Sequence, residues 1–445
     1  MCSAEYRRSG RLQILSERDG MTDNRKKAGE YQRVLMVAYH FPPCKISSGI
    51  QRTLKFADYL RESGWYGSVL SAHPRAYETT SDEQLGEIAE GVHVRRAWAL
   101  DTRRHLAVRG RYVRRMALPD RWVSWWLGAV VSGLVMVRRE RPAAIWSTYP
   151  IATAHLIGGT LHRLTGLPWI ADFRDQMTEE GYPTDPVAWR SYRRIEEWTV
   201  ARCAWAVFTT PGALRMYEAR YPELMRGKGV VIPNGYAEEN FAAVEAALPA
   251  QSQDPGRRLE LLHSGALYPE ERDPRPFFRA LARLRAAARI DAESLRVTLR
   301  ATGHDDVHAE SARAAGVEDL IVFAPALPYA DALREMMSVD GLLLFQATVC
   351  NHQIPAKVYE YFRAARPVLT LTDATGDTAA AVREAGLDHI VPLDDADGIE
   401  RGLGAFLDGL RDGSLAGADP DVTARYSRRA LTARLADLLD EVIEE

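Results

Sequence analysis

The stretch QIPAKVYEYFRAARPVL, residues 353–369, contains the side chains of this chain that are best placed for chemistry. Lys357 and Glu360 lie one helical turn apart, beside an apolar helix face that begins at Ile354. The proline after Ile354 suits the first turn of a helix, where free N–H groups can bind a phosphate. Only six of the 57 basic residues are lysines, so Lys357 stands out. The stretch predicts a phosphate-binding helix start, with an ordinary surface ion pair as the alternative.

A second group of reactive side chains ends the apolar stretch PWIADFRD, which predicts a buried strand at 168–175. Asp172 or Asp175 could position an acceptor or act as a general base, and Arg174 could bind phosphate. For each aspartate a structural role, such as a pair between Asp172 and Arg174 or a helix cap, is an equally good interpretation.

Gly49 lies where the first predicted strand passes into the first predicted helix. A glycine there lets the backbone approach an anion at the helix N-terminus, although the full GxGxxG pattern of a dinucleotide site is missing. A simple turn glycine is the alternative.

The region 103–141 is rich in arginine and also holds Trp122, Trp125 and Trp126. Basic residues beside tryptophans suit a surface on anionic lipid, so we expect a possible membrane contact from Arg103 to Trp126. A solvated basic loop followed by a buried helix is the alternative.

Alternating strands and helices must position these side chains. Strands are predicted from 33 up to the prolines at 42 and 43, around 68–72, 91–97, 143–150, 168–175, 206–212 and 229–236, and then around 259–265, 295–303, 320–327, 341–346, 366–372 and 389–395. Helices between them, such as 49–62, 152–165 and 189–204, favour two doubly wound parallel sheets, with a ligand at the carboxyl ends of the strands. We therefore expect two Rossmann-like α/β domains at 31–236 and 259–420. The other segments are a disordered extension at 1–30, a linker at 237–258 and a C-terminal helix at 421–445.

The overall composition narrows the class of protein. The chain has 445 residues, 46% apolar and 26% charged, with a net charge of −3, which gives no general attraction to nucleic acid. Four scattered cysteines predict a reducing cytoplasm, and the polar N-terminus lacks a secretory signal. The longest apolar run, 124–137, is shorter than the roughly 20 residues that span a bilayer. We expect a cytoplasmic protein; a peripheral position on the inner face of the plasma membrane stays open.

Five stretches between residues 33 and 395 resemble the retaining glycosyltransferases of family 4, which have the GT-B fold. They are HFPPCKISSGIQRTLKFADYL, WIADFRD, VIPNGY, LLHSGALYPEERDPRPFFRAL and IPAKVYEYFRAARPVL. The resemblance implies two Rossmann-like domains facing a central cleft. It also implies transfer of a sugar from a nucleotide-diphosphate donor, of the UDP or GDP type, to a hydroxyl acceptor with retention of configuration. The acceptor would be a glycan, or a lipid-linked glycan if the basic region contacts a membrane.

The resemblance also implies roles for individual residues on the donor side. Glu360 matches the second glutamate of the EX7E motif, which holds the ribose, and Arg272 lies near the basic residue that neutralises the diphosphate. The remaining donor-side residues are Gly49, Gly265, Phe323, Leu327, His352, Ile354, Lys357 and Val358. Of these, 354–358 would offer N–H groups to the phosphates and 323–327 would read the base.

Two positions depart from the family pattern. His352 stands where the first glutamate of EX7E would contact the donor sugar, which leaves the sugar open. Ala266 replaces the arginine that usually follows the glycine of the first loop in the second domain, so Arg272 would carry more of the charge.

No DxD motif ends a strand, so we expect no metal and no cofactor apart from the nucleotide sugar as co-substrate. Cationic side chains and helix N-termini would then stabilise the leaving diphosphate. Two other functions stay open: a sugar-nucleotide epimerase of the same architecture, and a non-catalytic scaffold at a membrane. His352 and Ala266 favour the scaffold, whereas Glu360, Lys357 and Arg272 argue against it.

Overall fold

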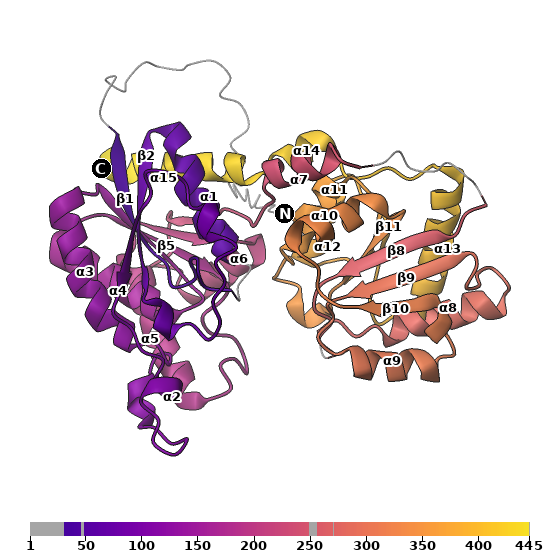
Figure 1. The fold of residues 1–445 in the computed structure, drawn as a ribbon, viewed down its shortest axis with the longest axis horizontal. Coiled ribbons are helices and arrows are strands. Elements are labelled where there is room, and N and C mark those ends of the chain that lie inside the picture. The colour runs from indigo at the N-terminus through magenta and orange to yellow at the C-terminus, as the bar shows by residue number, and fades with distance from the viewer. Residues whose placement is uncertain (1–30, 46–48, 249–255, 270, 445) are drawn as a thin grey trace, which may run out of the picture. The chain divides into compact units, whose positions relative to one another are not determined.

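A computed structural model describes residues 31–45, 49–248, 256–269 and 271–444. The expected extension at 1–30 lies outside these residues. From residue 32 onward the chain forms one compact unit that contains two parallel sheets, so the expected fold class is confirmed (Figure 1).

The first sheet has the strand order β3-β2-β1-β4-β5-β6-β7, and every pairing is parallel. Its strands are β1 (Gln32–Val37), β2 (Trp65–Ala72), β3 (His93–Ala97), β4 (Ala144–Thr148), β5 (Trp169–Arg174), β6 (Trp205–Phe208) and β7 (Gly229–Val231). The helices of this half are α1 (Gly49–Tyr59), α2 (Thr102–His105), α3 (Ser124–Glu140), α4 (Ala152–Thr165), α5 (Pro186–Arg202) and α6 (Pro211–Arg220).

The second sheet has the order β10-β9-β8-β11-β12-β13 and is also parallel. Its strands are β8 (Leu259–Ser264), β9 (Leu295–Arg300), β10 (Ile321–Ala324), β11 (Gly341–Phe345), β12 (Val368–Leu371) and β13 (Ile390–Val391). The other helices are α7 (Glu238–Glu245), α8 (Arg275–Ala286), α9 (Asp305–Ala314), α10 (Tyr329–Ser338), α11 (Lys357–Ala364), α12 (Asp377–Glu384), α13 (Ala396–Asp412), α14 (Pro420–Ala424) and α15 (Arg428–Glu444).

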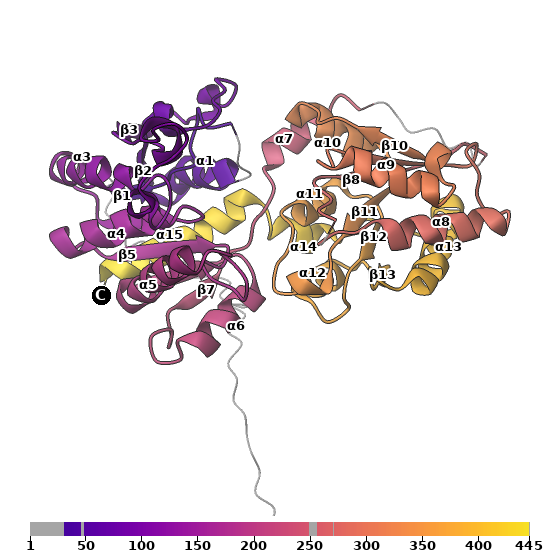
Figure 2. The same ribbon diagram turned by 90° about the horizontal axis from the view of Figure 1, so that it is seen from below.

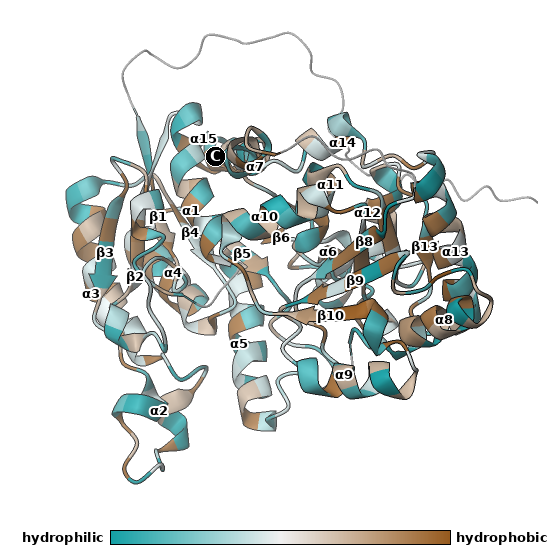
Figure 3. Ribbon diagram, turned by 45° about the vertical axis from the view of Figure 1, so that its right-hand side comes forward, coloured by the Kyte–Doolittle hydropathy of each residue, from teal (hydrophilic) through white to brown (hydrophobic). Residues whose placement is uncertain are grey.

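Each sheet is buried on both faces, as parallel sheets require. Apolar residues of α3, α4 and α5 cover one face of the first sheet, and those of α1 and α15 cover the other (Figure 2). In the second sheet, α8 and α13 cover one face, and α7, α10 and α11 cover the other. The strands of the second sheet are mainly brown in Figure 3, whereas the helices around them alternate brown with teal.

Three expected elements differ from the structure. The expected linker at 237–258 contains α7, because Phe241 and Val244 are buried in the core of the second half. The single C-terminal helix is divided into α14 and α15, and Leu431, Leu435 and Leu439 of α15 pack on the first sheet. The helix expected to begin at Ile354 begins at Lys357, so the three residues before it are free to line a site.

The three tryptophans expected at a membrane surface pack on the core of the first half: Trp125 lies within it, and Trp122 and Trp126 are partly buried against it. Trp125 is fully buried, and Trp122 packs against Tyr39 while its indole N–H donates to the carbonyl of Ala76 at 3.2 Å. The indole N–H of Trp126 donates to Thr160 Oγ1 at 3.0 Å. These rings therefore do not form the exposed aromatic surface that was expected, whereas the membrane contact itself stays a prediction. Among the described residues, no helix is both long and apolar enough to cross a membrane.

Candidate functional site

A polar cavity of about 180 Å³ lies at the carboxyl ends of strands from both sheets, where doubly wound folds bind ligands. Four expected site residues line it: Arg174, Asp175, Arg272 and Ile354. The remaining lining residues are Gln176, Thr209, Thr210, Asn234, Gln346, Gln353, Pro355 and Ala356. Asp175 is the single carboxylate in this lining, opposite two arginines.

Arg174 reaches the cavity because β5 ends in an unusual turn. Its φ is 52°, a left-handed conformation that is uncommon for a residue with a side chain, and Asp175 N–H donates to the carbonyl of Phe173 across the turn at 2.5 Å. Thr209 Oγ1 donates to the carbonyl of Arg174 at 2.5 Å and holds the turn from β6. Strained backbone of this kind is often found at functional sites.

Gly49, at the start of α1, accommodates the guanidinium of Arg174. A Cβ at position 49 would overlap Nη1 and Cζ of Arg174. The same guanidinium donates through Nη1 to the carbonyl of Tyr149 at 3.3 Å, and its buried Nε has no hydrogen-bond partner. A cation beside a helix N-terminus is unfavourable alone, because both are positive, but the two together suit a bound anion.

Burial shifts the pKa values of the groups around Arg174. It lowers the pKa of the Arg174 guanidinium, which Asp175 partly offsets. It raises the pKa of Asp175 above the ordinary value, against the opposing effect of Arg174, although this carboxylate is still reached by solvent. The pKa of His40, after β1, falls to about 4 because of burial and then Arg174. His40 is therefore neutral at physiological pH.

Asp172 does not line the cavity. Its carboxylate is fully buried and accepts from Arg52 Nε and Nη2, both at 2.9 Å, and from Thr148 Oγ1 at 2.9 Å. Arg52 also donates to the carbonyls of Ile232 and Pro233 at 2.9 and 2.8 Å. Of the two aspartates only Asp175 lines the cavity, while Asp172, through Arg52, ties α1 to the end of β5 and to the chain after β7.

Arg272 enters the cavity from the loop after β8. Its Nη1 donates to the carbonyl of Ala266 at 2.9 Å, the guanidinium lies 5.8 Å from the ring centre of Tyr268, and its buried Nε has no partner. Gly265 gives this loop a φ of 147°. The loop therefore holds Arg272 in place and leaves its Nε–H available to a ligand.

The chain before α11 completes the cavity. In the described part of the chain, the backbone N–H groups of Ile354 and Ala356 meet no hydrogen-bond acceptor. Gln346, only 1% exposed, donates to the carbonyls of Cys350 and Gln353 at 3.1 and 3.2 Å, and its buried Oε1 has no partner. These two N–H donors and the unused Oε1 acceptor line the same cavity, which indicates a ligand that is both anionic and polar.

Lys357 and Glu360 lie outside the lining and pair with each other, Nζ to Oε2 at 2.9 Å. Glu360 is 8% exposed, and its Oε1 accepts from the hydroxyl of Tyr329 at 2.9 Å. Burial, and then Glu360, raise the pKa of Tyr329. The expected pairing is present, and the carboxylate is held in place rather than solvated.

The structure places the remaining expected donor residues apart from the cavity. Val358 is a core residue of the second half, and Phe323 packs at the edge of that core. Leu327 is 36% exposed. The carbonyl of His352 accepts from Thr210 Oγ1 at 2.6 Å, and its Nε2 lies 3.3 Å from Glu179 Oε1, so its ring faces the first half.

Several lining residues were not expected from the sequence: Gln346, Asn234, Thr209, Thr210, Gln176 and Gln353. Two of them directly follow a strand, and Thr210 and Gln176 come two residues after β6 and β5. Gln346 comes one residue after β11, and Thr209 one residue after β6. A polar residue immediately after a buried parallel strand is therefore the sequence feature that would have identified them.

Comparison with known proteins agrees with this architecture. Residues 48–235, in the first half, match the family model of the glycosyl transferase 4-like domain. A search of curated proteins with this sequence gives no match.

Solved structures with the same fold cover nearly the whole chain. Sucrose-phosphate synthase from Thermosynechococcus elongatus has a TM-score of 0.61 at 13% identity, covering 93% of this chain and 99% of its own. HepE of Anabaena, solved with UDP-glucose, has a TM-score of 0.59 at 13% identity. The match covers 92% of this chain and 99% of the HepE chain. A putative UDP-N-acetylglucosamine 2-epimerase from Listeria monocytogenes has a TM-score of 0.55 at 13% identity. The match covers 93% of this chain and 97% of the epimerase chain. At these identities the likeness establishes the GT-B fold alone.

Proposed function

We propose that this chain, with a GT-B fold and a glycosyl transferase 4-like domain, transfers a sugar from a nucleotide-diphosphate donor to a hydroxyl acceptor. The observation that carries the proposal is the pair of cations in one cavity, Arg174 at the end of β5 and Arg272 in the loop after β8, each with a buried Nε that has no hydrogen-bond partner among the described residues. A diphosphate that leaves with negative charge suits that arrangement. HepE of Anabaena, of the same fold, was solved with UDP-glucose, which supports a donor of this class.

The barrier would be lowered by groups that bind the leaving diphosphate more tightly as its charge grows. Arg272, Arg174 and the free N–H groups of Ile354 and Ala356 supply such donors in a polar cavity. In this proposal they act without a metal ion or cofactor. Glu360, held by Tyr329 and Lys357, would bind the ribose hydroxyls.

Asp175 is our candidate for the acceptor side. Its raised pKa makes its carboxylate a stronger base than an ordinary aspartate, which suits a group that accepts or orients the acceptor hydroxyl proton. Retention of configuration and a lipid-linked glycan as acceptor belong to the same proposal. The family resemblance supports the first, and the basic surface of the first half supports the second.

A thermal-shift titration with UDP, GDP, ADP, dTDP and CMP tests the donor site. Any nucleotide at about 100 times its Kd should stabilise the folded protein by roughly 2.7 kcal/mol. Arg272→Ala should remove most of this shift. Arg275→Ala is the matched control, because Arg275 is exposed and, within the described ranges, forms its ion pair with the nearby Asp273 alone. Absence of a shift with every nucleotide would contradict the donor site and favour the scaffold.

The second candidate is a sugar-nucleotide epimerase, which the shared fold of the Listeria protein favours. An epimerase changes the donor without any acceptor. Incubation of the bound nucleotide sugar alone, followed by proton NMR of the anomeric region, separates the two. A new epimer would overturn transfer, whereas release of the nucleoside diphosphate only with an acceptor would support it.

A further inference from the structure

A basic and apolar segment projects from the first half between Asp101 and Asp120. Residues 102–119 contain no carboxylate, and all six of their arginines are exposed: Arg103, Arg104, Arg109, Arg111, Arg114 and Arg115. In the described part of the chain, only Arg114 of these forms an ion pair, with Asp185. Figure 1 shows α2 and the loop after it extending away from the first sheet.

The same segment exposes apolar side chains that a solvated loop would bury or lack. Val108 is 74% exposed, Val113 63%, Met116 45% and Tyr112 41%. Exposure of this many apolar side chains in one short segment indicates a contact with an apolar phase or partner.

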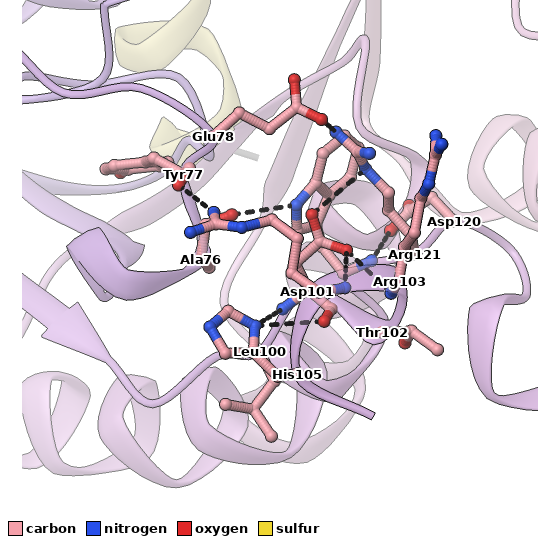
Figure 4. Close-up of polar contacts among 12 residues, drawn as sticks. Ala76, Tyr77, Glu78, Leu100, Asp101, Thr102, Arg103, His105, Asp120 and Arg121 are labelled. Carbon is pink, nitrogen blue, oxygen red and sulfur yellow. Dashed lines mark hydrogen bonds and ion pairs between the residues drawn. The ribbon is translucent and has the colours of Figure 1, made fainter. Parts of the chain in front are cut away.

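Hydrogen bonds hold the base of the segment in place (Figure 4). Asp101 is fully buried and caps α2 by accepting from the N–H groups of Arg103 and Arg104 at 2.9 and 3.4 Å. The N–H of Thr102 donates to the carbonyl of Arg121 at 2.8 Å, and its Oγ1 donates to the carbonyl of Met116 at 2.7 Å. These bonds fix both ends of the segment, so its exposed side chains are presented by a defined structure.

Helix α3 comes next in the sequence and also exposes apolar side chains. Leu127, Val131, Leu134 and Val135 are 59, 65, 37 and 42% exposed, at the spacing of one helix face. The solvent face of a surface helix is normally polar. A groove of about 170 Å³ between this helix and β3 has Arg95 and Arg139 in its lining.

We propose that residues 106–116 and the exposed face of α3 dock on an anionic membrane surface. Arginines around aliphatic side chains match a layer whose phosphates lie above acyl chains. A second copy of this chain fits less well, because a symmetric contact would bring the same arginines together. Single-stranded nucleic acid also fits less well, because its bases stack on aromatic rings and the exposed apolar residues are mainly aliphatic. The proposal does not depend on the donor site.

Co-sedimentation of the full chain with vesicles tests this surface. We expect sedimentation with phosphatidylcholine vesicles that contain one-third phosphatidylglycerol, and little with phosphatidylcholine alone. Each arginine near the surface should contribute about fivefold in affinity, so Arg109→Glu, Arg111→Glu and Arg115→Glu together should weaken binding at least roughly one hundredfold. Val108→Asp with Val113→Asp should weaken the binding that persists at high salt.

The matched control reverses three exposed arginines of the second half, Arg279, Arg313 and Arg401, to glutamate. It should sediment as the parent protein does, and all variants should keep the parent's unfolding temperature and nucleotide binding. Failure of the parent to sediment, or an equal loss in the control, would overturn the proposal. Two other results would also overturn the proposal if vesicles are not bound. One is binding to single-stranded RNA, and the other is a dimer mass in ultracentrifugation that Val131→Asp abolishes.

Discussion

The guanidinium of Arg174 lies directly over the α-carbon of Gly49, in the space that a side chain at position 49 would occupy. This relationship joins the turn at the end of β5 to the start of α1. It explains why a glycine begins that helix without a GxGxxG motif. The glycine admits a cation of the protein itself, and that cation faces the cavity.

Gly49→Ala should therefore impair ligand binding more than it impairs folding. The added methyl would displace the flexible end of Arg174, which costs little stability, but would move the cation from the cavity. We expect nucleotide-diphosphate affinity to fall at least roughly tenfold, the loss of a hydrogen bond to a charged group. Isothermal titration measures the affinity and thermal unfolding the stability.

Gly86→Ala serves as the control for this variant, because a Cβ at position 86 meets no atom within 4 Å. It should bind nucleotide as the parent protein does. Normal affinity in Gly49→Ala would mean that Arg174 does not contact the ligand.

The ion pair between Arg52 and Asp172 should matter for stability rather than catalysis. Asp172→Ala leaves a buried guanidinium without its partner, which should cost about 3–5 kcal/mol of unfolding free energy. Urea unfolding followed by circular dichroism measures this cost. A double variant, Arg52→Met with Asp172→Leu, should recover part of it because no unpaired charge remains. Full stability with lost turnover in Asp172→Ala would restore the catalytic role.

Burial of His155 should make folding sensitive to acid. Its side chain is fully buried, its Nδ1 lies 2.8 Å from Ser147 Oγ, and its Nε2 has no partner, so its pKa falls to about 3. The unfolded chain takes up this proton below about pH 6.5, whereas the folded chain does not until about pH 3. The stability that depends on neutral His155 is therefore present above pH 6.5 and is lost as the pH falls below it.

Urea unfolding between pH 7.5 and 4.5 measures this effect. Within the acid part of that range, His155→Gln should reduce the slope of unfolding free energy against pH by about 1.4 kcal/mol per pH unit, the value for one proton. An unchanged slope would show that the proton is taken up elsewhere.

The sequence predicted the two parallel sheets well, because a run such as LLLF, residues 342–345, is apolar on both faces and is typical of a buried strand. It predicted less well the helices and side-chain positions that depend on tertiary packing. The residues of α7 resemble a linker locally, and only the core of the second half makes Phe241 and Val244 a helix face. Asp172 and Asp175 are three positions apart in one motif, yet the left-handed turn at Arg174 buries one and directs the other to the cavity. A backbone turn of that kind leaves no periodic signal.

Substitutions at Lys357 and Glu360 can distinguish phosphate binding from ribose binding at the donor site. Their side chains touch, yet we expect Lys357 to bind phosphate and Glu360 to bind ribose. Lys357→Met should weaken a nucleoside diphosphate about tenfold or more and leave the nucleoside unaffected, since only the diphosphate carries the charge. Glu360→Gln should weaken both ligands, and a 2′,3′-dideoxy nucleotide should bind the parent and Glu360→Gln equally. Tyr329→Phe, which removes one contact of Glu360 without touching Lys357, should follow the pattern of Glu360→Gln in milder form. Equal effects of Lys357→Met on nucleoside and diphosphate would mean that the lysine acts only by holding Glu360.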